Sequence, residues 1–100
     1  MPEVSQKQID AWKAEHGDVF CFKLGANKDK ICYLKAPDRK TISFAGTAGA
    51  TDHIRYNEIM LEACWLAGDE EIKTNNGLFF SISQHIPSLV EITEVEMVKL

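Results

Sequence analysis

The longest periodic stretch of this sequence, residues 52–72, constrains the fold more than any other feature. Between Tyr56 and Ala67, apolar side chains recur at intervals of three and four residues, which is the repeat of an α-helix. Asp52 is a favourable N-cap, and Gly68 is a favourable stop, so we predict a helix that ends at Gly68 in a left-handed cap. Because apolar residues such as Trp65 widen the stripe beyond one face, this helix should pack centrally against two neighbours.

Length and composition favour one domain, residues 1–100. The chain has 100 residues, of which 45% are apolar, enough for one modest core. The sequence shows no secretory leader pattern and no run near the roughly 18 apolar residues of a membrane span. We therefore expect a cytoplasmic protein that does not enter membranes and whose three cysteines stay reduced.

The two halves of the chain differ in charge. Residues 1–50 carry eight Lys and Arg against six Asp and Glu, a sum of +2, whereas residues 51–100 carry three against nine, a sum of −6. Complementary halves can support association between subunits, and ordinary solvated faces explain the same distribution. Several lysines gather around residues 23–40, but the overall charge of −4 argues against nucleic-acid binding.

The N-terminal part, residues 1–17, predicts a short helix. Residues 5–8 fit a capping box with Ser5 as the N-cap, and Gly17 is a plausible end. A helix of about three turns is too short to persist alone. We therefore expect Ile9 and Trp12 to hold it against the rest of the protein.

Residues 19–35 predict a β-hairpin. The β-rich runs Val19–Leu24 and Lys30–Lys35 flank a turn in which Gly25 and Asn27 can take positive φ. If the register pairs even with odd positions, one face is shared by alternate residues of both strands. That face, the expected core side, would carry Phe20, Phe22, Leu24, Ile31 and Tyr33.

Residues 37–100 predict a mainly helical part. Pro37 suits the first position of a helix that ends near residues 45–51, and residues 69–71 suit the start of a later element. Residues 75–77 signal a turn and cap before a helix through Phe79, Ile82 and Ile86, which Pro87 stops, kinks or restarts. Residues 94–100 fit a helix, a strand or a loose tail. The predicted fold class is α+β: an N-terminal helix, one antiparallel hairpin, and three to four helices packed on it.

No group of residues in the sequence carries a specific catalytic or metal-binding signature. Cys21 and Cys32 share a hairpin face in the register considered above, which would suit a disulfide or half a metal site. However, there is no C-x-x-C motif, and neither His16 nor His53 stands at a zinc-binding spacing. Cys64, in the middle of the predicted helix, is most simply a core residue. We therefore predict no catalytic residue, no metal and no cofactor.

Four segments of the chain resemble the small tail assembly chaperones of long-tailed bacteriophages and prophages. They read WKxxHGDVF, YLKAPDRK, EIMLEACWLAGDEEI and EMVKL, and together they extend over almost the whole sequence. The resemblance implies a non-enzymatic factor that binds the tape-measure protein, promotes assembly of the tail-tube protein around it, and is absent from the finished virion. It also implies a host-cytoplasmic location, and a homo-oligomer is an open alternative to a monomer.

Such a role needs apolar surface that covers helical segments of a long partner. The residues expected to contact that partner are Trp65, Phe79 and Phe80, with Asp69, Glu70 and Glu71 as a polar rim. The acidic residues equally suit an ordinary solvated turn, and the apolar ones equally suit the core. Alternative functions are a structural tail or connector subunit, a small protein-interaction module, and a thiol or metal protein built on Cys21 and Cys32.

Overall fold

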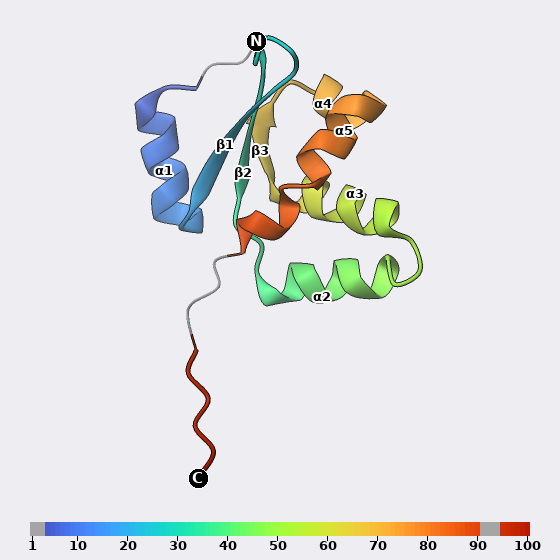
Figure 1. The fold of residues 1–100 in the computed structure, drawn as a ribbon. Helices are drawn as coiled ribbons and strands as arrows, with labels where there is room; N and C mark the ends of the chain where they lie inside the picture. Colours follow the sequence, from blue (N-terminus) through green and yellow to red (C-terminus); the bar gives the residue numbers. More distant parts are fainter. Residues whose placement is uncertain (1–3, 91–94) are drawn as a thin grey trace.

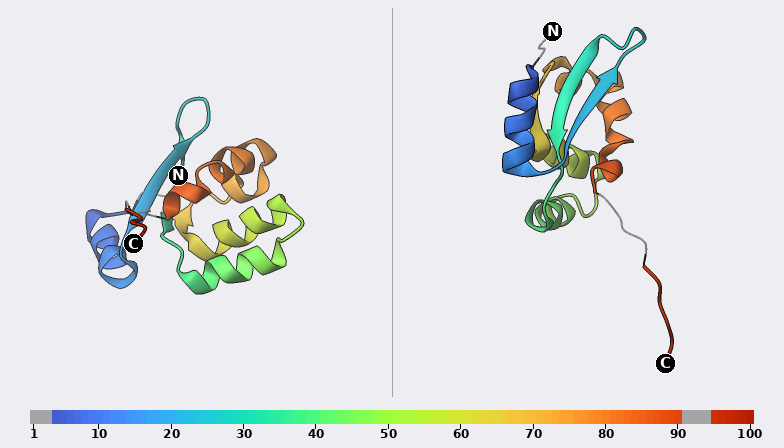
Figure 2. Two further views of the ribbon diagram at one scale, coloured as in Figure 1. Left: turned by 60° about the horizontal axis from the view of Figure 1, so that its bottom comes forward. Right: turned by 90° about the vertical axis from the view of Figure 1, so that its left-hand side faces the viewer.

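The computed structural model describes residues 4–90 and 95–100, and it confirms the α+β class. A three-stranded antiparallel sheet lies between helix α1 on one face and α3, α5 and η1 on the other, and α2 packs on α3 as an outer element (Figures 1 and 2). In chain order the elements are α1 (Gln6–His16), β1 (Val19–Leu24), β2 (Lys30–Lys35), α2 (Arg39–Ala48), α3 (His53–Cys64), β3 (Trp65–Gly68), α4 (Glu71–Thr74), α5 (Asn76–Ser83) and the 3₁₀ helix η1 (Ile86–Leu89).

The hairpin strands have the predicted bounds, but the register differs from the one we considered. Phe20 pairs with Leu34 and Phe22 with Cys32, so even positions pair with even positions. Phe20, Phe22 and Leu24 therefore share their face with Cys32 and Leu34, and the expectation for Ile31 and Tyr33 is wrong. Those two residues face α1, where the Trp12 ring lies 5.8 Å from that of Tyr33.

Strand β2 is central in the sheet, whose order is β1-β2-β3, and residues 31–34 are buried in succession. A strand that is covered on both faces needs apolar residues at consecutive positions rather than in alternation. In the turn before it, Gly25 has the positive φ expected of it, and Lys28 rather than Asn27 is the second such residue.

The long predicted helix is shorter than expected, because its last residues form strand β3. Helix α3 begins after Asp52 as predicted but ends at Cys64, and Trp65 is already extended. Strand β3 pairs antiparallel with β2, matching Tyr33 with Ala67 and Cys32 with Gly68. These backbone hydrogen bonds depend on the nearby β2 edge, which a pattern of apolar residues does not reveal.

Gly68 ends this strand and is not the left-handed helix cap that we predicted. Its φ is +150°, and a Cβ added to it would lie 2.6 Å from Cys32 Cα and 2.7 Å from the Ile31 carbonyl oxygen. Only glycine allows so close an approach of two backbones without displacing one of them. Gly68 therefore allows β3 to lie against β2.

Side-chain caps fix the beginnings of four helices. Ser5, Asp52 and Asn75 accept hydrogen bonds from backbone N–H groups two or three residues ahead, as predicted for each. Asp38 caps α2 by accepting from Thr41 N at 2.7 Å. Pro37 therefore lies outside the helix, and our placement of it as the first helical residue is wrong.

The C-terminal helix is interrupted earlier than predicted. Helix α5 ends at Ser83, and Ile86 belongs to η1, where Pro87 stands near the beginning of the turn. A continuation of this turn beyond Val90 would fall on residues 91–94, which lie outside the described residues. Residues 95–100 have no regular secondary structure and lead away from the body (Figure 1).

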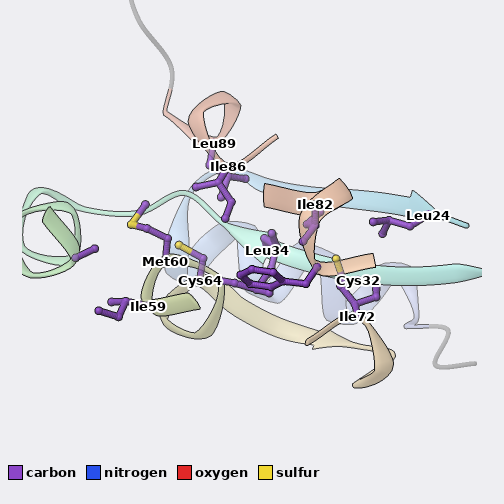
Figure 3. Close-up of a cluster of buried hydrophobic side chains, with 13 residues drawn as sticks. Leu24, Cys32, Leu34, Ile59, Met60, Cys64, Ile72, Ile82, Ile86 and Leu89 are labelled. Carbon is purple, nitrogen blue, oxygen red and sulfur yellow. The ribbon is translucent and has the colours of Figure 1, made fainter. Parts of the chain in front are cut away.

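The core lies between the sheet and the helices on the side of α3 (Figure 3). Leu34 from β2 is fully buried, and side chains from α3, α4, α5 and η1 surround it. Burial of a side chain of this size stabilises the fold by about 1.5–3 kcal/mol relative to exposure. The largest fully buried residues are Leu34, Met60, Ile72, Ile82, Ile86, Leu89, Cys32 and Cys64.

Candidate functional site

Helices α2 and α3 form an antiparallel pair whose inner faces are packed closely. Ala45 is buried and Ile42 packs against the core from α2. At the end of α2, a Cβ added to Gly49 would lie 2.6 Å from the Tyr56 backbone nitrogen. The lack of a side chain at Gly49 therefore allows the chain to reverse tightly into α3 (Figure 1).

The outer side of this pair carries an open groove of about 740 Å³. Its apolar residues are Ile59, Ala63 and Phe44, and the Phe44 side chain is 64% exposed. An aromatic ring that stands free beside a hollow offers apolar contact area that water now covers. The groove is lined by Lys40, Thr41, Phe44, Arg55, Glu58, Ile59, Glu62 and Ala63.

Charged residues of both signs border the α2–α3 groove. Arg55 and Glu58 lie 4.0 Å apart on successive turns, and Glu62 lies 3.3 Å from the Lys73 ammonium group. Among the described residues, Lys40 forms no ion pair. The groove therefore has one rim cation that can bind an incoming carboxylate without breaking an ion pair of the fold.

The predicted apolar contact residues lie apart from the α2–α3 groove. Trp65 is half-buried in β3, with the Lys73 ammonium group 4.4 Å from its ring. Phe79 is 8% exposed and belongs to the core, whereas its neighbour Phe80 is 49% exposed on α5. Of these three residues, Phe80 offers the largest free surface to a partner in this conformation.

The predicted acidic rim makes specific contacts within the fold. Asp69 N donates to the Ile31 carbonyl oxygen at 2.9 Å, and Ile31 N donates to the Asp69 carboxylate at 2.9 Å. Glu71 lies 2.7 Å from the Lys30 ammonium group, and this contact raises the pKa of Lys30 through a hydrogen bond and charge attraction. These carboxylates hold β3 and α4 against the hairpin.

Glu70, the third acidic residue, lies 3.2 Å from the Lys73 ammonium group. This pair is exposed at the carboxylate end, so it contributes little to stability. Whether residues 69–71 also contact a partner stays a prediction.

The cysteines do not come together. Cys21 pairs with Tyr33 and Cys32 with Phe22, so the two thiols point to opposite faces of the hairpin, and our placement of them on one face is wrong. Burial raises the pKa of the Cys32 thiol to about 12 and that of Cys64 to about 11. A raised pKa keeps a thiol protonated and unreactive near neutral pH. Within residues 4–90 and 95–100, no three His, Cys, Asp or Glu side chains are placed to hold a metal ion.

The residues that line the α2–α3 groove were not predicted from the sequence, because the apolar stripe of residues 52–72 is the stronger pattern in it. A signal was present in α2. Phe44 lies between Ile42 and Ala45, which face the core, so helical geometry turns its ring away from them. A large aromatic residue off the buried stripe of a helix indicates a surface contact.

Taken together, the fold and the groove define a small α+β domain with an open apolar groove between two helices. None of the helices in the described part of the chain has the length and apolar character needed to span a bilayer. Comparison with protein-family models, with curated proteins and with solved structures finds no significant match for this chain.

Proposed function

We propose that this protein is a non-enzymatic tail assembly chaperone that binds helical segments of a tape-measure protein in the α2–α3 groove. The observation that supports this proposal most directly is the exposed Phe44 ring beside a hollow of about 740 Å³. The resemblance of four sequence segments to phage tail assembly chaperones supplies the identity of the partner. On this proposal the protein acts in the host cytoplasm and leaves before the virion is complete.

The groove suits a repeated helical partner for physical reasons. An amphipathic helix binds a groove through apolar side chains spaced three and four residues apart, and Phe44 and Ile59 provide the apolar contact here. Rim charges of both signs orient a partner without restricting it to one sequence. A long partner with repeated helical segments offers many such sites, so several copies can cover it.

Co-expression with a tape-measure protein encoded beside this gene tests the proposal. The wild-type chain should raise the soluble fraction of that protein and co-purify with it, and Phe44→Glu should abolish both effects. Phe80→Glu is the matched control, because it places the same charge on another exposed helical phenylalanine. If Phe80→Glu abolishes rescue and Phe44→Glu does not, the partner binds at α5, as the sequence suggested, and the groove assignment is wrong.

Failure of rescue by the wild-type chain would contradict the proposal as a whole. Mass spectrometry of purified virions separates the chaperone from the structural alternative. A chaperone should be missing from the particles, whereas a tail or connector subunit should be present in a fixed ratio to the other tail proteins.

A further inference from the structure

The C-terminal segment, residues 95–100, carries apolar side chains that stay exposed among the described residues. Val95, Met97, Val98 and Leu100 are each at least 65% exposed. Four of its six side chains are apolar, with Glu96 and Lys99 between them, and in water such exposed apolar surface favours a contact that buries it. We call this segment the tail.

The tail and the α2–α3 groove are complementary in charge as well as in apolar character. The tail carries Glu96, and the groove presents Lys40, whose ammonium group is not engaged in an ion pair among the described residues. Lys99 can in turn approach the acidic side of the groove at Glu58.

The length of the tail also matches the length of the groove. Six extended residues span about 20 Å, and the part of α3 that lines the groove, from residue 55 to residue 63, is about 12 Å long. The tail is therefore long enough to cover the groove.

The direction of the tail indicates which groove it fills. In Figure 1 and in the right-hand view of Figure 2, residues 95–100 lead away from their own α2–α3 pair. We propose that the tail of one copy binds in the α2–α3 groove of a second copy. When two copies exchange tails reciprocally, the result is a closed two-fold dimer with two identical contacts.

The contact between the tail of one copy and the groove of another does not depend on which protein is the partner in the proposed function. If that partner uses the same groove, the tail of a second copy competes with it. A tail variant should then increase, and not decrease, the rescue of the tape-measure protein. Loss of self-association and loss of rescue are therefore separable results.

The test measures molar mass by light scattering at protein concentrations from about 10 µM to 1 mM, the range in which contacts of this small size are populated. The wild-type chain should approach twice its monomer mass. Phe44→Glu should stay monomeric, and so should the triple variant Val95→Asp, Met97→Asp, Val98→Asp. These side chains are exposed, so the variants should fold, which circular dichroism checks. Phe80→Glu, the matched control, should dimerise like the wild type.

Mixing the variants distinguishes exchange between copies from folding back within one copy. The Phe44→Glu chain keeps an intact tail, and the triple variant keeps an intact groove. When the isotopically labelled triple variant is titrated with unlabelled Phe44→Glu, amide signals around Ile59 and Ala63 should shift. Wild-type protein that stays monomeric throughout the range, an absence of shifts in this titration, or a dimer that Phe44→Glu leaves intact would each overturn the proposal.

Discussion

Gly68→Ala tests whether the close approach of β3 to β2 determines the position of β3. In the wild type, the Gly68 backbone lies so near β2 that an added methyl group would meet Cys32 Cα at 2.6 Å and Cys32 Cβ at 2.7 Å. Two of the nearest three atoms belong to the backbone of the central strand, which cannot move as a flexible side-chain end can. Alanine must therefore push the two strands apart or change the backbone angle at residue 68.

The magnitude follows from two separate costs. An L-residue held at φ +150° is strained by about 1–3 kcal/mol. Insertion of a methyl group into a packed contact costs a further 1–3 kcal/mol or so. The variant should therefore lose about 2–6 kcal/mol of unfolding free energy, a large part of the roughly 5–15 kcal/mol expected of a domain.

Thermal unfolding followed by circular dichroism measures this loss. In a domain of this size each kcal/mol shifts Tm by about 4–8 °C, so Gly68→Ala should lower Tm by at least about 8 °C. The matched control is Gly46→Ala in α2, where an added Cβ meets no atom within 4 Å. Because alanine favours helix over glycine, this control should gain about 0.5–1 kcal/mol. A Gly68→Ala protein as stable as the wild type would refute the reasoning about β3.

Three further predictions concern stability and reactivity. Leu34→Ala should lower the free energy of unfolding, measured in urea, by about 2–5 kcal/mol. Phe44→Ala, at an exposed position, should leave it within about 0.5 kcal/mol of the wild-type value. Similar losses for both variants would contradict the assignment of Leu34 to the core. At pH 8 a thiol reagent should modify the exposed Cys21 quickly. It should modify Cys32 and Cys64 only after denaturation, because both are buried and their pKa values are raised. Fast modification of all three cysteines would be inconsistent with this burial. The hydrogen bond from Thr41 N lowers the pKa of Asp38 in the folded state below its unfolded value. The carboxylate therefore stabilises the fold at neutral pH and loses that effect as the pH falls through the lowered pKa. The stability difference between the wild type and Asp38→Asn should therefore shrink from pH 7 to pH 3, and a difference independent of pH would exclude this role.

The elements that were predicted well depend on interactions between residues close in sequence. The hairpin strands, the cap at Ser5 and the cap at Asn75 each follow from a few adjacent side chains and backbone groups. The same holds for the start of α3 at Asp52. In these places local chemistry and the final structure agree.

The candidate site was not predictable in the same way. Trp65 and residues 69–71 stood out in the sequence, yet Trp65 pairs within the sheet and Asp69 binds the backbone of Ile31. The groove needs α2 and α3 side by side, with Phe44 on the outer side of the pair. That arrangement depends on how Gly49 and Tyr56 meet, which is a contact between two helices and not a property of either one.

The amino-acid sequence by itself determined the α+β class, the hairpin and most helix starts, because caps, turns and local periodicity act within a few residues. Only the tertiary structure decided that residues 65–68 form a third strand, that even positions pair with even positions in the hairpin, and that Phe44 lies beside a groove. Each of these depends on partners distant in sequence. An apolar residue such as Trp65 is compatible with a helix and with a strand, and only the neighbouring edge of β2 decides between the two.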